Sequence, residues 1–321
     1  MKGSTYISLL LILVVACFGL VACEKSVYQL EEEKSAGKSD KNDAGANLIL
    51  RIVAAETRAG EDITNYWGTI NFVAYQNNDK VKAITQQRGE NGYGEAAMKL
   101  TPGTYQVLVL AHSSNGNPSL ANPKKIDFTN TIGFTDTYYY YGDIVVEETA
   151  KEHTVDLKRA SSLVHFIIKD ELPATVNQFQ FYYEGGSGAL DATTGYGCEA
   201  SRQSVYLDVD HEAGPPYTFD LYTMLRTDSA TLKMQVKGFK SNNTIVKING
   251  KDIRDFSIPV VRAGRVNFVG NFYAEDSDDT TSPDDEETDS NQNDPEVVDS
   301  TASTFYITAD TTWHNTITIT Y

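Results

Sequence analysis

Cysteine and basic residues are both scarce in this chain. Of 321 residues only three are cysteines, Cys17, Cys23 and Cys198. Lys and Arg number 27 against 44 Asp and Glu, a formal charge of -17 that argues against nucleic acid as a partner. Long runs of Ala, Leu, Glu and Lys are also absent, so a helical protein is not expected.

The usual signatures of catalysis and metal binding are missing as well. There is no P-loop or dinucleotide fingerprint, and Gly185-Gly186-Ser187-Gly188 lacks nucleophile-elbow spacing and is interpreted as a loop. No histidine stands at metal-ligand spacing from another His or Cys, and His165 is expected to be packed and hydrogen-bonded. Asp208, Asp210 and Glu212 are interpreted as one solvated face of a strand. We therefore predict no enzyme activity, no metal and no cofactor.

The N-terminal segment resembles a lipoprotein signal. Lys2 gives a positive start, and Ile7 to Phe18 form an apolar stretch about twelve residues long, too short to span a bilayer. Leu20-Val21-Ala22-Cys23 resembles a bacterial lipobox, so we predict a signal peptide over 1–22 and acylation, palmitate included, at Cys23. An ordinary signal peptide followed by a chance cysteine is the alternative. With Cys17 removed and Cys23 acylated, Cys198 cannot form an intrachain disulfide and is expected to be buried or idle.

Two polar stretches separate the expected folded parts. Residues 23–46 are predicted to form a flexible tether. Residues 275–302 hold twelve acids and no Lys or Arg, so they carry most of the formal charge and are predicted to be a disordered linker. Residues 303–321 follow as a predicted β-hairpin, with Asp310 to Asn315 as its turn. Two strands alone bury too little apolar surface, so this hairpin needs a partner surface.

Between these stretches the sequence favours short strands. Tyr (19), Phe (13), Val, Ile and Thr are frequent, and turn residues bound each apolar run. We predict an all-β chain with two β-sandwich domains in tandem, over 47–158 and 159–274. The strands expected in the first are 48–53, 70–75, 105–111, 138–146 (interrupted at Gly142) and 155–157. Those in the second are 163–168, 179–183, 205–209, 217–224, 232–236 and 266–269, with a tight Asn249-Gly250 turn.

Several local patterns follow one another in a recognisable order. The lipobox is followed by Thr57-Arg58-Ala59, by Leu100-Thr101-Pro102-Gly103-Thr104-Tyr105, by Tyr138-Tyr139-Tyr140-Tyr141-Gly142 and by Val155-Asp156-Leu157-Lys158-Arg159-Ala160. This order resembles the fimbrillin superfamily of type V pili in Bacteroidales, and within it the FimB-type anchor subunits. The resemblance covers about residues 20–270. It implies two transthyretin-like Greek-key sandwiches at the cell outer membrane, facing the exterior.

The resemblance also implies a mode of assembly. In pilus subunits of that superfamily an arginine-specific protease removes the first strand, and a strand of the next subunit fills the groove by β-strand addition. An anchor subunit keeps its lipid, holds the fimbrium on the membrane and stops growth. We therefore expect a lipid-anchored anchor or assembly subunit whose partners are other fimbrial subunits, with a host protein or glycan ligand left open. Cleavage after Arg58 would instead remove Cys23 and the first strand, and would give a stalk or tip subunit.

Two further questions stay open at the level of sequence. The candidate strand-exchange residues of the tail are Phe305, Ile307, Trp313, Ile317, Ile319 and Tyr321. This tail either donates a strand to a neighbour or folds back on the second domain. Folding back is favoured, because a partner surface in the same chain has the higher effective concentration. A glycan-binding surface lipoprotein is the other alternative. Its candidate aromatics are Trp67 and Tyr138 to Tyr141, unless these pack into the core.

Overall fold

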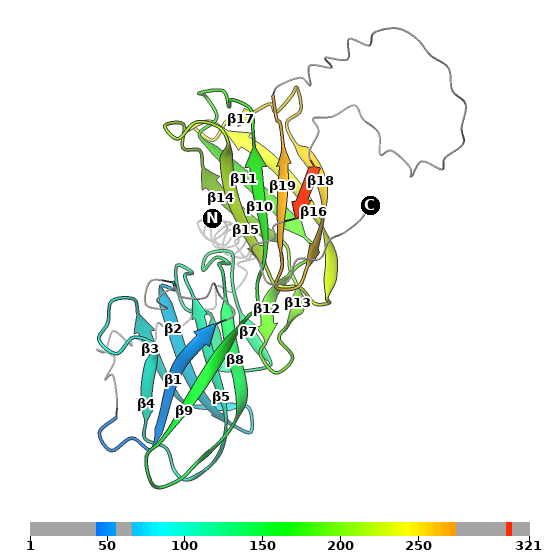
Figure 1. The fold of residues 1–321 in the computed structure, drawn as a ribbon. Helices are drawn as coiled ribbons and strands as arrows, with labels where there is room; N and C mark the ends of the chain where they lie inside the picture. The colour runs from blue at the N-terminus through cyan, green and yellow to red at the C-terminus, as the bar shows by residue number, and fades with distance from the viewer. Residues whose placement is uncertain (1–42, 56–65, 274–305, 310–321) are drawn as a thin grey trace, which may run out of the picture. The chain divides into compact units, whose positions relative to one another are not determined.

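Every regular element that the structure describes is a β-strand (Figure 1). The structure is a computed structural model, and it describes residues 43–55, 66–273 and 306–309. The predicted fold class, all-β with sandwich sheets, is confirmed. Cys23, Arg58, the acidic stretch and the last twelve residues lie outside the described ranges.

The first strand set forms a sheet of order β3-β2-β5-β8-β9-β1-β4. Its alternating residues bury one apolar face, with Leu48, Phe72, Val107 and Leu157 fully buried in one cluster. The strands are β1 (Leu48–Ala55), β2 (Thr69–Gln76), β3 (Asp79–Gln87), β4 (Glu95–Met98), β5 (Gly103–His112), β8 (Tyr138–Val146) and β9 (Lys151–Arg159). β8 and β9 pair only at two positions, where Tyr138 is opposite Arg159 and Tyr139 is opposite Lys158.

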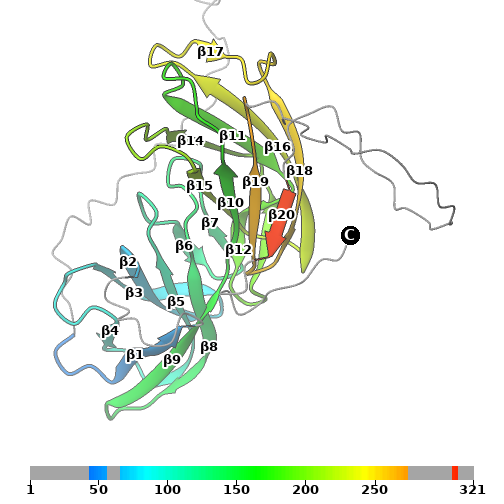
Figure 2. The ribbon, with the colours of Figure 1, turned by 45° about the horizontal axis from the view of Figure 1, so that its top comes forward.

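The second strand set repeats this topology. One sheet has the order β15-β10-β19-β20, and the other has the order β14-β11-β16-β17 with β18 paired to β16. β10 lies parallel to β19 and antiparallel to β15, just as β1 lies parallel to β9 and antiparallel to β4. The strands are β10 (Ser162–Ile168), β11 (Gln178–Glu184), β14 (Gln203–Asp208), β15 (Tyr217–Thr223), β16 (Ser229–Phe239), β17 (Ile245–Val246), β18 (Arg254–Val261), β19 (Arg265–Gly270) and β20 (Tyr306–Ala309). Figure 2 shows β20 lying beside β19.

A small shared sheet joins the two strand sets. Its order is β13-β12-β7-β6, and its strands are β6 (Ser119–Asn122), β7 (Lys125–Asp127), β12 (Ser187–Asp191) and β13 (Tyr196–Ala200). β7 pairs with β12 through Ile126 and Leu190, which are both fully buried in a third apolar cluster. All of these strands belong to one compact unit. The division into two domains at residue 158 stays a prediction.

Two glycine-containing segments differ from the expectations drawn from sequence. β8 runs without interruption through Gly142, which pairs with Val107 of β5. The Tyr140 side chain lies over this glycine, its hydroxyl 2.6 Å from where a Cβ would stand. The segment interpreted as a loop at 185–188 is strand from Ser187 onward, since its backbone pairs across the shared sheet. The strands β3, β4 and β18 were not predicted at all.

Candidate functional site

Strand β1 is the candidate site, because it is held from both sides inside the first strand set. Four of its residues pair antiparallel with β4, and seven pair parallel with β9. The side chains of Leu48 and Leu50 are fully buried and Ile52 is 5% exposed. The alternation Leu48, Leu50, Ile52 explains this placement, since every second side chain of a strand points to the same face. The prediction of a first strand beginning at Leu48 is confirmed.

The residues just ahead of β1 are tied to the body of the first strand set. Asp43 accepts hydrogen bonds from Lys82 Nζ at 3.0 Å and from the Lys99 backbone N–H at 2.6 Å. A turn follows, in which Gly45 has φ +72° and the Ala46 N–H donates to the Asp43 carbonyl. These contacts hold the pKa of Asp43 below its usual range, chiefly through the hydrogen bond from Lys82.

Asn47 makes the most buried polar contacts at this site. Its side-chain amide donates to the Leu100 carbonyl at 2.9 Å and to the Glu147 carbonyl at 2.6 Å. Its side-chain oxygen accepts the Leu100 N–H at 2.8 Å, and the residue is only 2% exposed. The sequence analysis did not identify Asn47 or Asp43 as site residues: Asp43 falls in the predicted tether over 23–46, and Asn47 is the first residue of the predicted sandwich over 47–158. The only available signal was their position directly before an apolar alternation.

The tail is described only at β20. Residues 306–309 pair antiparallel with β19, where Phe268 is opposite Ile307 and Val266 is opposite Ala309. The backbone of this part of the tail therefore folds back onto its own second strand set. Phe305, Trp313, Ile317, Ile319 and Tyr321 lie outside the described residues, and so does the second strand of the expected hairpin.

The aromatic candidates for glycan binding are part of the core. Trp67 is 1% exposed, and its ring lies 5.2 Å from that of Tyr138. Tyr138 and Tyr139 are buried, while Tyr140 and Tyr141 are half-buried. A glycan platform at Trp67 is therefore wrong, because a sugar stacks only on a ring face that solvent can reach.

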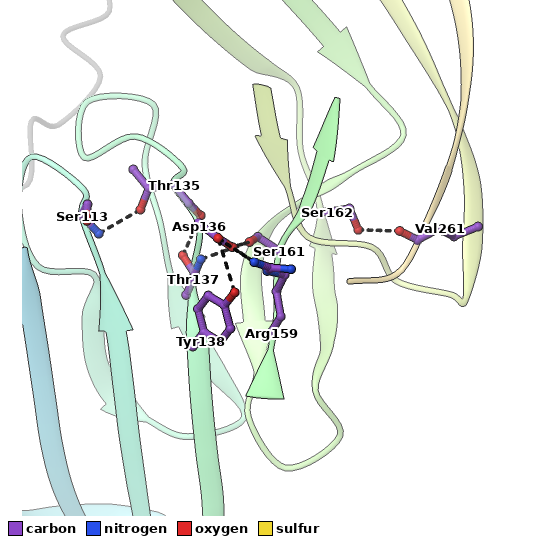
Figure 3. A network of polar contacts seen from close by, with 9 residues as sticks. All are labelled: Ser113, Thr135, Asp136, Thr137, Tyr138, Arg159, Ser161, Ser162 and Val261. Atoms are coloured by element: carbon purple, nitrogen blue, oxygen red, sulfur yellow. Dashed lines mark hydrogen bonds and ion pairs between the residues drawn. The ribbon is translucent and has the colours of Figure 1, made fainter. Parts of the chain in front are cut away.

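A polar network fixes the connection between β9 and β10 (Figure 3). Arg159 donates to both carboxylate oxygens of Asp136, at 2.8 and 2.9 Å, and its guanidinium lies 4.8 Å from the centre of the Tyr138 ring. Ser161 donates to Asp136 and accepts the Thr137 N–H, as Figure 3 shows. A planar, two-point Arg–carboxylate pair sets orientation as well as distance, so the crossing between the two strand sets is held in one geometry.

The remaining polar candidates have structural partners. His165 Nδ1 lies 2.6 Å from Asp220 Oδ1, so the expectation of a hydrogen-bonded histidine is confirmed. Asp208 accepts from Gln178, and Asp210 accepts backbone N–H groups of its own turn. Within 43–55, 66–273 and 306–309, no three His, Cys, Asp or Glu side chains gather at metal-binding distance.

Cys198 is exposed and unpaired, so of the two expectations, a buried thiol or an idle one, burial is wrong. Desolvation, followed by the nearby carboxylates Asp191, Asp127 and Glu199, raises the pKa of its thiol. A raised pKa lowers the fraction of reactive thiolate at neutral pH. Over the part of the chain that the structure describes, no helix has the length and apolar character needed to cross a membrane.

Comparison with protein families gives a match over most of the chain. The model of the family described as fimbrillin-A associated anchor proteins Mfa1 and Mfa2 matches residues 60–280. No curated protein matches the chain.

Three solved structures illustrate the structural similarity. A candidate adhesin from Bacteroides ovatus is 14% identical, with 77% of this chain and 95% of that chain covered and a TM-score of 0.44. The fimbrial anchor protein Mfa2 from Porphyromonas gingivalis is 10% identical, with 70% and 90% covered and a TM-score of 0.41. The tip fimbrial protein Mfa3 from Porphyromonas gingivalis, with a C-terminal truncation, is 11% identical, with 81% and 98% covered and a TM-score of 0.36.

Proposed function

Because the chain belongs to the family of fimbrillin-A associated anchor proteins Mfa1 and Mfa2, we propose that it is a lipid-anchored subunit that holds a fimbrium at the cell surface. Family membership supports a structural role in a fimbrium, with other fimbrial subunits as partners. Acylation of Cys23 in the outer membrane and joining of subunits by β-strand addition are the finer parts of this proposal. A non-enzymatic role is also part of it.

The position of β1 is the observation that carries strand addition. β1 lies between β4 and β9 and supplies three buried apolar side chains to the core. A strand that left this place would free the backbone groups of two neighbours and uncover apolar surface. Such a groove favours an incoming strand that makes main-chain hydrogen bonds and fills alternate pockets. An exposed edge of this kind is otherwise prone to aggregate.

The distance from Cys23 to the folded part supports a tethered subunit. Residues 24–42 separate Cys23 from Asp43, the first described residue. Nineteen extended residues span at most about 65 Å, since each adds roughly 3.4 Å. A lipid on Cys23 would thus hold the strand sets near the membrane while leaving room for neighbouring subunits.

Replacement of Cys23 by Ser tests the lipid part of the proposal. We expect the Cys23→Ser chain to lose membrane retention in cell fractionation, because the acyl chains attach to the cysteine sulfur. A Cys198→Ser chain, which keeps the lipid site, is the matched control and should fractionate as the unaltered protein does. Equal membrane retention of the Cys23→Ser chain would rule out lipid anchoring at this residue.

A processed stalk or tip subunit is the second candidate function. It is favoured by the position of Arg58, three residues after β1 ends at Ala55. Cleavage there would separate β1 and Cys23 from the rest of the chain. N-terminal sequencing of the mature protein from cells distinguishes the two functions. A start at Cys23 supports an anchor, whereas a start at Ala59 supports a fibre subunit.

A further inference from the structure

The groove that holds β1 recognises more than an extended backbone. We call the β1 groove the surface formed by β4, β9 and the loop segments at Leu100 and Glu147. The ladder bonds of β4 and β9 reach main-chain groups, which any strand possesses. The pockets under Leu48, Leu50 and Ile52 accept apolar side chains, which any alternating strand provides. Neither feature distinguishes one partner strand from another.

The hydrogen-bonding groups around the Asn47 side chain require a side chain that most strands do not carry at this position. The groove offers its side chain two carbonyl acceptors, Leu100 and Glu147, and one donor, the Leu100 N–H. Asn is the side chain of this length that carries two N–H donors and one oxygen acceptor. The Asp carboxylate has no N–H donors, the Ser and Thr hydroxyls have one donor each, and an apolar side chain has neither a donor nor an acceptor. The bonds between Asn47 and Leu100 are buried, so water cannot replace the missing groups at low cost.

The backbone at Asn47 fixes the register of this side chain. Its N–H donates to the Met98 carbonyl on the β4 side, and its carbonyl accepts the Lys151 N–H on the β9 side. The amide therefore stands one residue ahead of the first buried apolar side chain, Leu48. A strand shifted by one residue would place its apolar side chains on the wrong face.

We propose that the Asn47 position is the specificity determinant of the β1 groove. A strand that replaces β1 must carry Asn directly before an apolar residue that begins an alternating pattern. The inference rests on the second candidate function, in which cleavage after Arg58 allows β1 to leave its groove, since it concerns the strand exchange by which processed subunits would join. It also identifies the kind of partner, namely a subunit that donates a segment of the form Asn-apolar-x-apolar-x-apolar.

The tail of a second copy does not meet this requirement. Its alternating residues Ile317, Ile319 and Tyr321 would take the places of Leu48, Leu50 and Ile52. Thr316 then falls at the Asn47 position and cannot supply two donors. If Asn315 is aligned with Asn47 instead, threonines enter the apolar pockets. The partner strand is therefore expected to come from a different subunit.

Peptide exchange into a nicked protein tests the proposal. A site for a sequence-specific protease is placed within 56–65 of the mature chain, so that β1 stays in place without covalent attachment to β2. Labelled peptides of residues 43–55 then compete with β1, and fluorescence anisotropy reports their binding. The peptides are the natural sequence, Asn47→Ala, Asn47→Asp and, as matched control, Ile49→Ala, whose side chain is not fully buried. A peptide of residues 310–321 represents the tail.

The natural and Ile49→Ala peptides are expected to bind within about threefold of each other. The Asn47→Ala and Asn47→Asp peptides are expected to bind about 10- to 100-fold more weakly, because buried partners of the amide stay unpaired. The tail peptide should bind as weakly as Asn47→Ala. Equal binding of the natural and Asn47→Ala peptides would overturn the proposed specificity while leaving strand exchange intact. If even the natural peptide fails to enter, strand exchange at this groove is wrong, and the specificity falls with it.

Discussion

His112 is a buried base at the end of β5, and it makes stability depend on pH. Its side chain is fully buried, the Ser114 N–H donates to Nδ1 at 3.2 Å, and the Asn71 amide nitrogen lies 3.2 Å from Nε2. Burial lowers the pKa of His112 to about 4 in the folded protein. The imidazole is therefore neutral in the native state over most of the acidic range.

The sign of the effect follows from proton uptake. Between pH 6.5 and 4 the unfolded chain protonates His112 while the native chain does not, so stability falls as pH is lowered through this window. We expect the unaltered protein to lose up to about 3 kcal/mol more than His112→Gln over that range, measured by urea unfolding. Other titrating groups contribute equally to both proteins and cancel in the difference. Parallel pH profiles would contradict a neutral buried imidazole.

Gly186 is packed where a methyl group has no room. A Cβ at this position would overlap the hydroxyl of Thr223, whose Oγ1 is buried without a hydrogen-bond partner among the described residues. We expect Gly186→Ala to lower the free energy of unfolding by about 1–3 kcal/mol through overpacking. Thr223→Ala should restore part of this loss, since it removes the hydroxyl that the new methyl meets. A double-mutant cycle with no coupling between the two sites would disprove this close contact.

Local backbone features were predictable where one or two residues decide them. The Asn249-Gly250 pair was expected to form a tight hairpin, and both residues have positive φ, 48° and 75°. Asn77 and Asn78, in the turn between β2 and β3, also have positive φ, 55° and 67°, a conformation that asparagine tolerates. The expected interruption at Gly142 is wrong, because this glycine pairs with Val107 of β5, a contact between distant residues that no local pattern indicates.

At the scale of elements, β20 protects one edge of β19. Leu163 and Lys169 of the β10 segment donate to the Gly264 and Gly270 carbonyls, so the even-numbered residues of β19 bond to β10. Odd-numbered residues such as Asn267 and Val269 then direct their amides to β20.

Ending the chain after Thr304 removes β20 and tests this arrangement. We expect the Asn267 and Val269 amides to exchange hydrogen at least about tenfold faster, because they lose their ladder partner. Val266 and Phe268 are the internal controls and should keep their rates, since β10 still holds them. Hydrogen exchange measured residue by residue would reveal the alternation. Unchanged rates at Asn267 and Val269 would show that the tail does not pair here.

Strands were predictable where burial is one-sided and apolar, and were missed elsewhere. Apolar alternation or short apolar runs predicted five strands close to their observed bounds, namely β1, β2, β10, β11 and β19. β3 was missed because its first half is polar and exposed, and β18 because it contains Pro259. Proline is tolerated there since β18 pairs only with β16 among the described strands. β12 is rich in small residues that pack across the shared sheet, a contact no local pattern indicates.

At the scale of the whole molecule, the candidate site depends on contacts between distant residues. Asn47 bonds to Leu100 and Glu147, which are 53 and 100 residues away in sequence. A sequence shows the apolar alternation of β1 but not which loops close around its start. The strand was therefore predictable and the residue that would give it specificity was not.

We expect the shared sheet to make the two strand sets unfold as one cooperative unit. Ile126 of β7 and Leu190 of β12 pair directly and are fully buried, and Phe128 donates its N–H to the Gly188 carbonyl at 2.8 Å. Unfolding either set alone would expose this apolar cluster to water, so the free-energy cost of exposing it opposes the separate unfolding of each set. In a Trp313→Phe background, the fluorescence of Trp67 reports the first set alone, and far-UV circular dichroism reports both sets.

We expect the two signals to give the same urea midpoint in the Trp313→Phe protein. Ile126→Ala should lower both midpoints together, by about 2–5 kcal/mol in unfolding free energy, because it opens a cavity in the cluster that both sets share. Val81→Ala is the matched control, since Val81 is 48% exposed on β3 and should change stability by less than about 0.5 kcal/mol. A shift of the Trp67 signal alone would mean that the strand sets unfold independently. A pull on the tether would then unfold the first set without the second, whereas a cooperative unit resists that load as a whole.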